Sequence, residues 1–164
     1  MKDIYENIVE LLEQNRFSVL ATLIKQAGSA PRGIGTKCLI LEDGSMVGTI
    51  GGGLLEARVI EEAKNIFSTR LAKRLSLFLK GTDVAETDMI CGGDVEIFLE
   101  PVFPENRNNL SIFKRIKDVT VRGGSGILFT VVDAERWQSG KVPKMLLEAD
   151  GQRTGSPLAL PRYQ

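Results

Sequence analysis

Three successive glycines, Gly51, Gly52 and Gly53, follow an expected strand and lead directly into an expected amphipathic helix. Glycine lets neighbouring backbone N–H groups point in one direction, and the start of a helix carries partial positive charge. Such a turn can hold a phosphate or another small anion. The alternative is that the glycines only allow a tight connection between strand and helix. Glu56, in the first turn of the helix, can either cap the exposed N–H groups or face a ligand.

A second glycine-rich segment, residues 28–35, lies between two expected strands. It contains Ser29, a hydroxyl donor, and Arg32, whose guanidinium can bind a phosphate or carboxylate through two parallel hydrogen bonds. The loop can therefore wrap around an anion. The alternative for Arg32 is an ordinary surface ion pair with Asp or Glu. Whether this loop and the glycine turn lie at the same end of the sheet depends on a strand register that the sequence leaves open.

The two cysteines stand in different surroundings. Cys91 precedes Gly92 and Gly93, so its neighbours leave the sulfur approachable, and a thiolate there can bind a soft metal or accept sulfur. Cys38 lies in an alternating apolar strand, where a cysteine usually acts as a small buried hydrophobe. We predict a functional role for Cys91 and a packing role for Cys38.

Composition excludes several classes of function. Histidine is absent, which removes Ser–His and Cys–His catalytic pairs and nearly all catalytic zinc sites. Two cysteines are too few for a four-thiolate metal site or a disulfide framework. Lys plus Arg equals Asp plus Glu at 21 each, so nucleic acid is not an expected partner. With no membrane-spanning apolar stretch and no signal peptide, we expect a cytoplasmic protein without a membrane partner.

The length of 164 residues and the hydrophobic content of 43% predict a single domain. Apolar spacing predicts helices over residues 3–14, 54–68 and 110–117. Apolar runs and alternation predict strands over residues 17–24, 37–41, 45–50, 75–80, 95–100 and 126–132, with a hairpin turn at Asp43-Gly44. The expected fold is α/β, a mixed β-sheet with flanking helices.

Two charged sets are interpreted as facing solvent. Glu96 and Glu100 lie on one face of an expected strand and could form a carboxylate pair, but alternation favours a solvated face. The basic run at residues 70–74 is interpreted as a solvated helix end.

An internal repeat joins the two ends of the chain. The segment SVLATLIKQ…KCLILEDGSMVGT is echoed by GILFTVVDA…KMLLEADGQRTGS, and Lys37 matches Lys144. With the helix before each copy, the unit reads helix, long strand, loop, strand, Asp-Gly turn, strand. We infer an internal helix–strand–hairpin duplication, against the alternative of chance similarity. The glycine loop and the triple glycine occur in the first copy alone, so we expect function to be concentrated there.

Three segments carry a resemblance to a known family. They are the G-S-x-P-R-x-x-G loop of residues 28–35, the G-x-I-G-G-G turn of residues 48–53 and the C-G-G-x-x-x-x-x-x-E-P segment of residues 91–101. In this order they resemble the amino-terminal domain of the xanthine dehydrogenase accessory factor family, the XdhC/CoxI type. A typical member continues into a Rossmann-like carboxy-terminal domain. Residues 1–164 are expected to be a single XdhC/CoxI-like domain without that second domain, either as a stand-alone half or as a piece cut from a longer protein.

The resemblance implies a chaperone for the molybdenum cofactor, or molybdopterin, a pterin dithiolene that bears a phosphate. Such proteins hold the cofactor during sulfuration and pass it to a molybdenum hydroxylase of the xanthine dehydrogenase or CO dehydrogenase type. The cofactor-binding residues implied by the matching motifs are Ser29, Pro31, Arg32, Gly35, Gly51, Gly52, Gly53, Glu56, Cys91, Gly92 and Gly93. We hypothesise that the glycine turn and Arg32 hold the phosphate and that Cys91 is the metal ligand.

Two other functions stay open. Cys91 could accept a persulfide from a cysteine desulfurase, which would make the chain a sulfurtransferase-like enzyme. Alternatively, the chain could bind its target enzyme without touching the cofactor. We favour a maturation factor without turnover, whose partner is a molybdenum hydroxylase apoenzyme. Open sheet edges also allow a homodimer.

Overall fold

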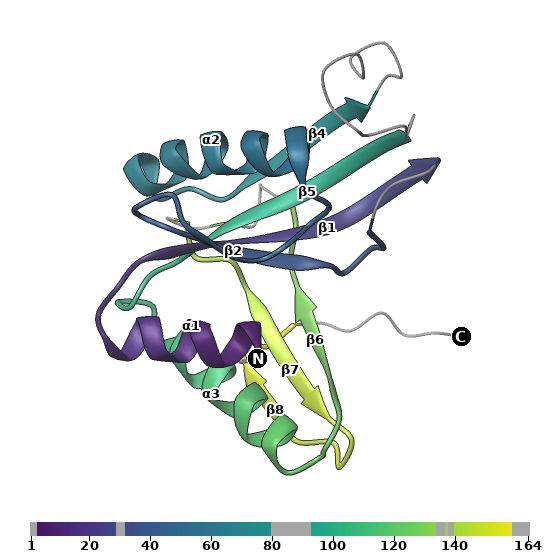
Figure 1. The fold of residues 1–164 in the computed structure, drawn as a ribbon. Helices are drawn as coiled ribbons and strands as arrows, with labels where there is room; N and C mark the ends of the chain where they lie inside the picture. The colour runs from purple at the N-terminus through teal and green to yellow at the C-terminus, as the bar shows by residue number, and fades with distance from the viewer. Residues whose placement is uncertain (1–2, 29–31, 80–92, 134–136, 138–139, 159–164) are drawn as a thin grey trace.

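The computed structural model describes residues 3–28, 32–79, 93–133, 137 and 140–158 (Figure 1). Its helices are α1 (Ile4–Glu13), α2 (Gly53–Thr69) and α3 (Arg107–Val121). Its strands are β1 (Ser18–Gly28), β2 (Lys37–Leu41), β3 (Met46–Gly48), β4 (Lys73–Leu79), β5 (Gly93–Val102), β6 (Gly126–Thr130), β7 (Lys144–Glu148) and β8 (Arg153–Gly155). The α/β class with flanking helices is confirmed. Within the described residues, the strands form two antiparallel sheets instead of one mixed sheet.

The larger sheet has the strand order β3-β2-β1-β5-β4. Helix α2 crosses one face of it and connects the β3 edge to the β4 edge (Figure 1). Every third or fourth residue of α2 is apolar, and Leu55, Val59, Ala63 and Ile66 are buried against strand residues such as Ile97. Through this packing, α2 covers one face of the larger sheet.

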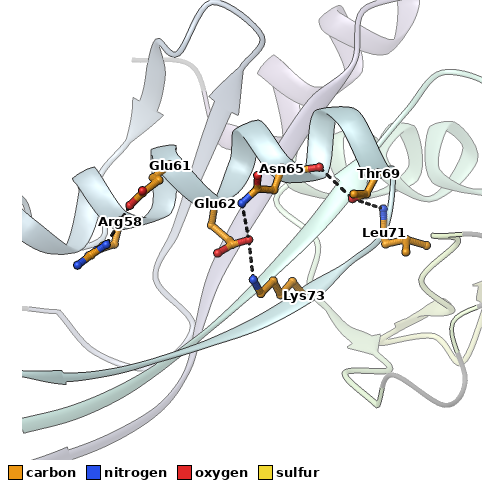
Figure 2. A network of polar contacts seen from close by, with 7 residues as sticks. All are labelled: Arg58, Glu61, Glu62, Asn65, Thr69, Leu71 and Lys73. Carbon is orange, nitrogen blue, oxygen red and sulfur yellow. Dashed lines mark hydrogen bonds and ion pairs between the residues drawn. The ribbon is translucent and has the colours of Figure 1, made fainter.

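Polar contacts tie the far end of α2 to β4 (Figure 2). The Lys73 ammonium lies 2.7 Å from the Glu62 carboxylate, and the Asn65 amide donates to the same carboxylate at 3.1 Å. The Lys73 partner lowers the pKa of Glu62. Because the contact joins helix and strand, it helps fix the position of the helix on the sheet.

None of the described helices is long and apolar enough to cross a membrane.

The smaller sheet, β6-β7-β8, lies on the opposite side of the larger one together with α1 and α3 (Figure 1). A second core joins the two helices to both sheets, with Ile8, Phe113, Leu20 and Leu146 among its buried members. The ring of Tyr5 on α1 stacks on Phe113 of α3 at a centroid distance of 6.1 Å. The molecule is therefore layered, with α2 on one face of the larger sheet and the second sheet and two helices on the other.

The repeat inferred from sequence is visible in the order of elements. Residues 4–48 form α1-β1-β2-β3, and residues 107–155 form α3-β6-β7-β8. Thr22 pairs with Lys37 across β1 and β2, just as Thr130 pairs with Lys144 across β6 and β7. We call residues 4–48 the first unit and residues 107–155 the second unit.

The Asp-Gly turns of the two units make the same hydrogen bonds. The Ser45 N–H donates to Asp43 Oδ1 and the Gln152 N–H donates to Asp150 Oδ1, both at 2.9 Å. In each turn the glycine N–H donates to the last strand carbonyl, again at 2.9 Å. These local bonds show the same turn chemistry in both copies.

A buried ion pair connects the two sheets and corrects one sequence interpretation. Glu100 of β5, expected on a solvated face, is 3% exposed and pairs with Lys144 of β7, which is 1% exposed. Strand alternation places Glu100 on the face away from α2, but it cannot reveal that a second sheet covers that face. Burial lowers the pKa of Lys144, while Glu100 opposes that shift. Glu96 pairs instead with Arg74 on β4.

The basic run at residues 70–74 is exposed and follows the end of a helix, as expected, but it continues into a strand. Helix α2 ends at Thr69, and Arg70 adopts a left-handed conformation with φ of 60°. The Arg70 guanidinium stacks over Phe103 at 4.5 Å and over Phe17 at 5.3 Å, and it pairs with Glu105 at 2.9 Å. The run thus connects α2 to β4 and keeps its three basic side chains largely in solvent.

Candidate functional site at one end of the larger sheet

The strand register brings the glycine motifs to one end of the larger sheet. Strand β1 ends at Gly28, which pairs with Gly93 at the start of β5. Strand β3 ends at Gly48, which pairs with Cys38 near the start of β2. The 28–35 loop, the 48–53 turn and the first residue of β5 therefore lie toward the same end of the sheet. Gly28 and Gly93 lie farther out than the turn, because Cys38, the partner of Gly48, pairs with Ala21, seven residues before Gly28. This answers the question that the sequence left open.

The glycine turn is held in a conformation that favours glycine. Gly51, Gly52 and Gly53 have φ values of 137°, 79° and 55°. A side chain at Gly52 would meet no other atom within 4 Å, so the backbone angle, and not crowding, accounts for glycine at this position. Helix α2 begins at Gly53, and the first N–H groups of a helix have no acceptor within it. The turn thus presents the donors that an anion site requires.

Glu56 already supplies an anionic oxygen to this turn. Its Oε1 accepts the Gly52 N–H at 3.0 Å and the Thr49 hydroxyl at 2.5 Å. The Thr49 hydroxyl oxygen in turn accepts the Gly51 N–H at 3.3 Å. These contacts are the capping arrangement that sequence analysis weighed for Glu56. They also demonstrate that the turn binds a carboxylate.

The described part of the 28–35 loop is anchored to the sheet behind it. The Gly35 N–H donates to the Leu23 carbonyl at 2.8 Å, and the Thr36 hydroxyl donates to the Gly33 carbonyl at 2.7 Å. Arg32 is exposed and has no ion pair with another described residue. Gly35 has a φ of 90°, which fits its place in the glycine motif.

Lys37 is a site residue that sequence reasoning did not single out. Its ammonium donates to the Gly35 carbonyl at 2.9 Å and so anchors the loop from below. Burial lowers the pKa of Lys37, and nearby Lys144 adds to that effect while Glu100 opposes it. The available signal was the match between Lys37 and Lys144, since both repeated lysines lie near the same buried glutamate.

The cysteines differ as far as the structure describes them. Cys38 is fully buried in the core beneath α2, and burial raises the pKa of its thiol to about 12, with a smaller contribution from Glu56. The packing role predicted for Cys38 is confirmed. Cys91 lies outside the described residues, as do Ser29, Pro31 and Gly92. Gly93 is described, buried, and paired with Gly28 and Leu79.

No group of three or more Cys, Asp or Glu side chains that could hold a metal ion occurs within the described ranges. The groups that these ranges offer to an anion are the backbone N–H groups of the glycine turn and the exposed Arg32 guanidinium.

Comparison with known proteins shows which proteins the chain is similar to. Residues 11–77 match the XdhC and CoxI family, and this range contains both the 28–35 loop and the 48–53 turn. The solved structure of a xanthine dehydrogenase from Bacillus halodurans superposes with a TM-score of 0.68 at 26% identity, covering 93% of this chain and 45% of that one.

Three curated relatives align with parts of the chain. A probable xanthine dehydrogenase subunit of Bacillus subtilis is 25% identical over 162 residues, which cover 93% of this chain and 48% of the relative. The molybdenum cofactor insertion chaperone PaoD of Escherichia coli is 29% identical over 91 residues, 56% of this chain and 28% of the chaperone. The uncharacterized protein YqeB of Escherichia coli is 34% identical over 99 residues, 59% of this chain and 18% of the relative.

The chain spans less than half the length of each of these proteins. Residues 11–77 match the XdhC and CoxI family, and the resemblance to xanthine dehydrogenase accessory factors that the motifs predicted is confirmed.

Proposed function

We propose that this chain binds the molybdenum cofactor and holds it for sulfuration and insertion into a molybdenum hydroxylase of the xanthine dehydrogenase or CO dehydrogenase type. The observation that carries the proposal is that the 28–35 loop and the 48–53 turn lie toward the same end of the larger sheet, where the Gly35 N–H bonds back to Leu23 of β1. The family match and the similarity to a cofactor insertion chaperone support the choice of ligand.

The phosphate of the cofactor is assigned to the glycine turn and Arg32. Backbone N–H groups at a helix start favour an anion, and an exposed guanidinium adds charge and two parallel donors. A phosphate at this turn would compete with the Glu56 carboxylate for the Gly52 N–H, because Glu56 occupies that donor in the structure. Glu56 therefore acts in this proposal as an anionic side chain that leaves the turn when the phosphate arrives.

The molybdenum end of the cofactor is assigned to Cys91, which precedes the described segment that starts at Gly93. A thiolate is a soft ligand suited to a metal that already carries sulfur. Cys38 is the natural control for this assignment, since its thiol is buried in the core and its pKa is raised to about 12.

The test is cofactor retention. The chain is purified without oxygen, mixed with free molybdenum cofactor and separated from unbound material, and retained molybdenum and pterin are measured for wild type, Cys91→Ala and Cys38→Ala. We expect nearly one cofactor per chain for wild type and Cys38→Ala, and loss of molybdenum for Cys91→Ala. Retention by all three proteins would move the metal contact away from Cys91. No retention by wild type would overturn the carrier function.

A further inference from the structure

Three strands of the larger sheet carry a second set of polar and aromatic side chains next to the site. Asp94 of β5 pairs with Ala27 of β1 and with Phe78 of β4. Glu96 pairs in the same way with Lys25 and Ser76. Directly paired residues lie on the same face of a sheet, so these six side chains form one patch. We call it the β1-β5-β4 face.

The β1-β5-β4 face looks away from α2. Val95 and Ile97 alternate with Asp94 and Glu96 along β5 and are buried in the core beneath α2, so Asp94 and Glu96 point to the opposite side. A shallow cavity lies over this patch, lined by Lys25, Ala27, Ser76, Phe78, Asp94 and Glu96 together with Leu77 and Val95. The cavity thus adjoins Gly28 and Gly93, where the end of β1 pairs with the start of β5.

Two members of this face have no partner among the described residues. Phe78 is 67% exposed, and no ring contact joins it to another described aromatic side chain. Asp94 is exposed and forms no hydrogen bond or ion pair with another described residue. Glu96, by contrast, is held by Arg74 and also lies near Lys25. The exposed Phe78 ring therefore lies beside the Asp94 carboxylate, which has no hydrogen-bond or ion-pair partner among the described residues.

This pair of groups suits a planar heterocycle that carries N–H donors on one edge. Aromatic side chains stack on such rings, and a carboxylate can accept two parallel hydrogen bonds from adjacent N–H groups. Side chains directly opposite each other on neighbouring strands have Cβ atoms roughly 5 Å apart, so Phe78 can contact the face of a ring while Asp94 meets its edge.

We propose that the β1-β5-β4 face binds the pterin ring of the molybdenum cofactor, with Phe78 stacking on the ring and Asp94 accepting from its 2-amino group and N3–H. The inference rests on the proposed cofactor-binding function and adds a second contact region to it. Ala27 in this face directly precedes the loop that contains Arg32. The ring would therefore lie beside the start of the loop that contains Arg32.

The probe for this proposal is pterin itself, 2-amino-4-oxopteridine, whose fluorescence is followed as the full chain is titrated in. We expect saturable quenching by wild type, about tenfold weaker binding by Phe78→Ala and by Asp94→Asn, and nearly wild-type binding by Phe78→Tyr. Ile127→Ala, at a residue 58% exposed on β6 of the second unit, is the matched control and should bind as wild type. The oxo analogue lumazine, which lacks the 2-amino group, should bind about tenfold more weakly to wild type.

Cofactor retention measured in parallel separates the two proposals. Wild-type retention together with equal pterin affinity for wild type, Phe78→Ala and Asp94→Asn would overturn the pterin assignment and leave the carrier function standing. Loss of pterin binding in the two variants would support the assignment even if wild type failed to retain the complete cofactor. Absence of saturable pterin binding by wild type would overturn the assignment. Unchanged thermal unfolding of the variants would establish that weaker binding is not loss of fold.

Discussion

The first and second units share a plan but differ in the strand that leads to their loop. Both have a helix, a three-stranded meander and an Asp-Gly turn with identical hydrogen bonds. Strand β1 of the first unit has 11 residues, whereas β6 of the second has 5. Strand β1 pairs with β2 over its first residues and with β5 as far as Gly28, so its greater length carries the glycine loop out to Gly93. The difference in strand length thus accounts for the position of the glycine loop, which the second unit lacks.

The two units also meet at a shared charge. Lys37 and Lys144 occupy equivalent positions in the two units. The Glu100 carboxylate of β5 opposes the lowering of the pKa that burial causes in each lysine. Lys144 is enclosed with the glutamate, whereas Lys37 reaches the Gly35 carbonyl of the binding loop. Lys144 thus forms an ion pair between the two sheets, whereas Lys37 donates a hydrogen bond to the glycine loop.

The largest effect should come from breaking the ion pair between the sheets. Glu100→Ala leaves the buried Lys144 ammonium without its counter-charge, and loss of one member of a buried pair costs about 3–5 kcal/mol of unfolding free energy. Urea denaturation measures this loss. Glu61→Ala, which removes an exposed ion pair with Arg58, is the control and should cost less than about 1 kcal/mol. Equal costs for the two variants would contradict the assignment of Glu100 as a buried partner.

Equivalent glycines should respond unequally to alanine. Gly48 and Gly155 have φ values of 83° and 109°, so both substitutions are strained. A Cβ at Gly155 would lie 2.5 Å from the Lys144 carbonyl oxygen and from Ile112, but a Cβ at Gly48 would lie 3.0 Å from the Lys37 carbonyl oxygen. We expect losses of about 3 kcal/mol for Gly155→Ala and about 2 kcal/mol for Gly48→Ala in thermal or urea unfolding.

Gly151→Ala is the control for this pair, because its φ is 89° but nothing lies within 4 Å of the added atom. It should cost about 1 kcal/mol, which is the backbone contribution alone. A larger loss at Gly48 than at Gly155 would show that crowding does not distinguish the two units.

The stability of the protein at alkaline pH should depend on Tyr5, one member of the stacked pair Tyr5 and Phe113. Burial raises the pKa of Tyr5 to about 12, with further contributions from Asp3 and Glu100, whereas Phe113 has no ionisable group. Between pH 10 and 12 the unfolded chain loses the Tyr5 proton before the folded chain does, so Tyr5 lowers stability as the pH rises through this window. Tyr5→Phe should therefore unfold with about 1 kcal/mol less alkaline loss than wild type at pH 11. Parallel stability curves from pH 9 to 11.5 would refute this explanation.

The smallest effect concerns the helix ends. Asn15 after α1 has a φ of 58° and Gly123 after α3 has a φ of 68°, and the next N–H in each unit bonds back to the helix, to Leu11 and Val119 respectively. Asn15→Gly should raise the unfolding temperature slightly, by an amount equivalent to a few tenths of a kcal/mol, because glycine adopts this conformation without steric cost. Gly123→Asn should have the opposite sign. Two changes of the same sign would indicate that the ends are not equivalent.

Features that depend on local residues could be predicted from the sequence. The Asp43-Gly44 turn and the burial of Cys38 each follow from neighbours within a few positions, and the structure agrees with both. The repeat follows from matching two segments of the sequence, and the structure agrees with its order of elements. The helix predicted over 110–117 spans Arg107–Val121, and β1 continues to Gly28 instead of ending near residue 24. Both elements include polar residues beyond the apolar pattern, before it in the helix and after it in β1.

Features that depend on tertiary packing could not be predicted. The burial of Glu100 depends on a second sheet contributed by residues more than twenty positions later in the chain. The position of the glycine loop beside the start of β5 depends on the pairing of Gly28 with Gly93, which no local pattern encodes. The assignments for Ser29, Pro31, Cys91 and Gly92 stay predictions, since those residues lie outside the described ranges.

The most direct test of the difference between the units compares one arginine from each. Cofactor retention is measured for wild type, Arg32→Ala in the loop of the first unit and Arg153→Ala on β8 of the second, since both arginines are exposed. The account predicts nearly one cofactor per chain for wild type and Arg153→Ala, and about tenfold weaker retention for Arg32→Ala, which loses a charge-assisted contact with the phosphate. Equal retention by the two variants would contradict the placement of the cofactor in the first unit.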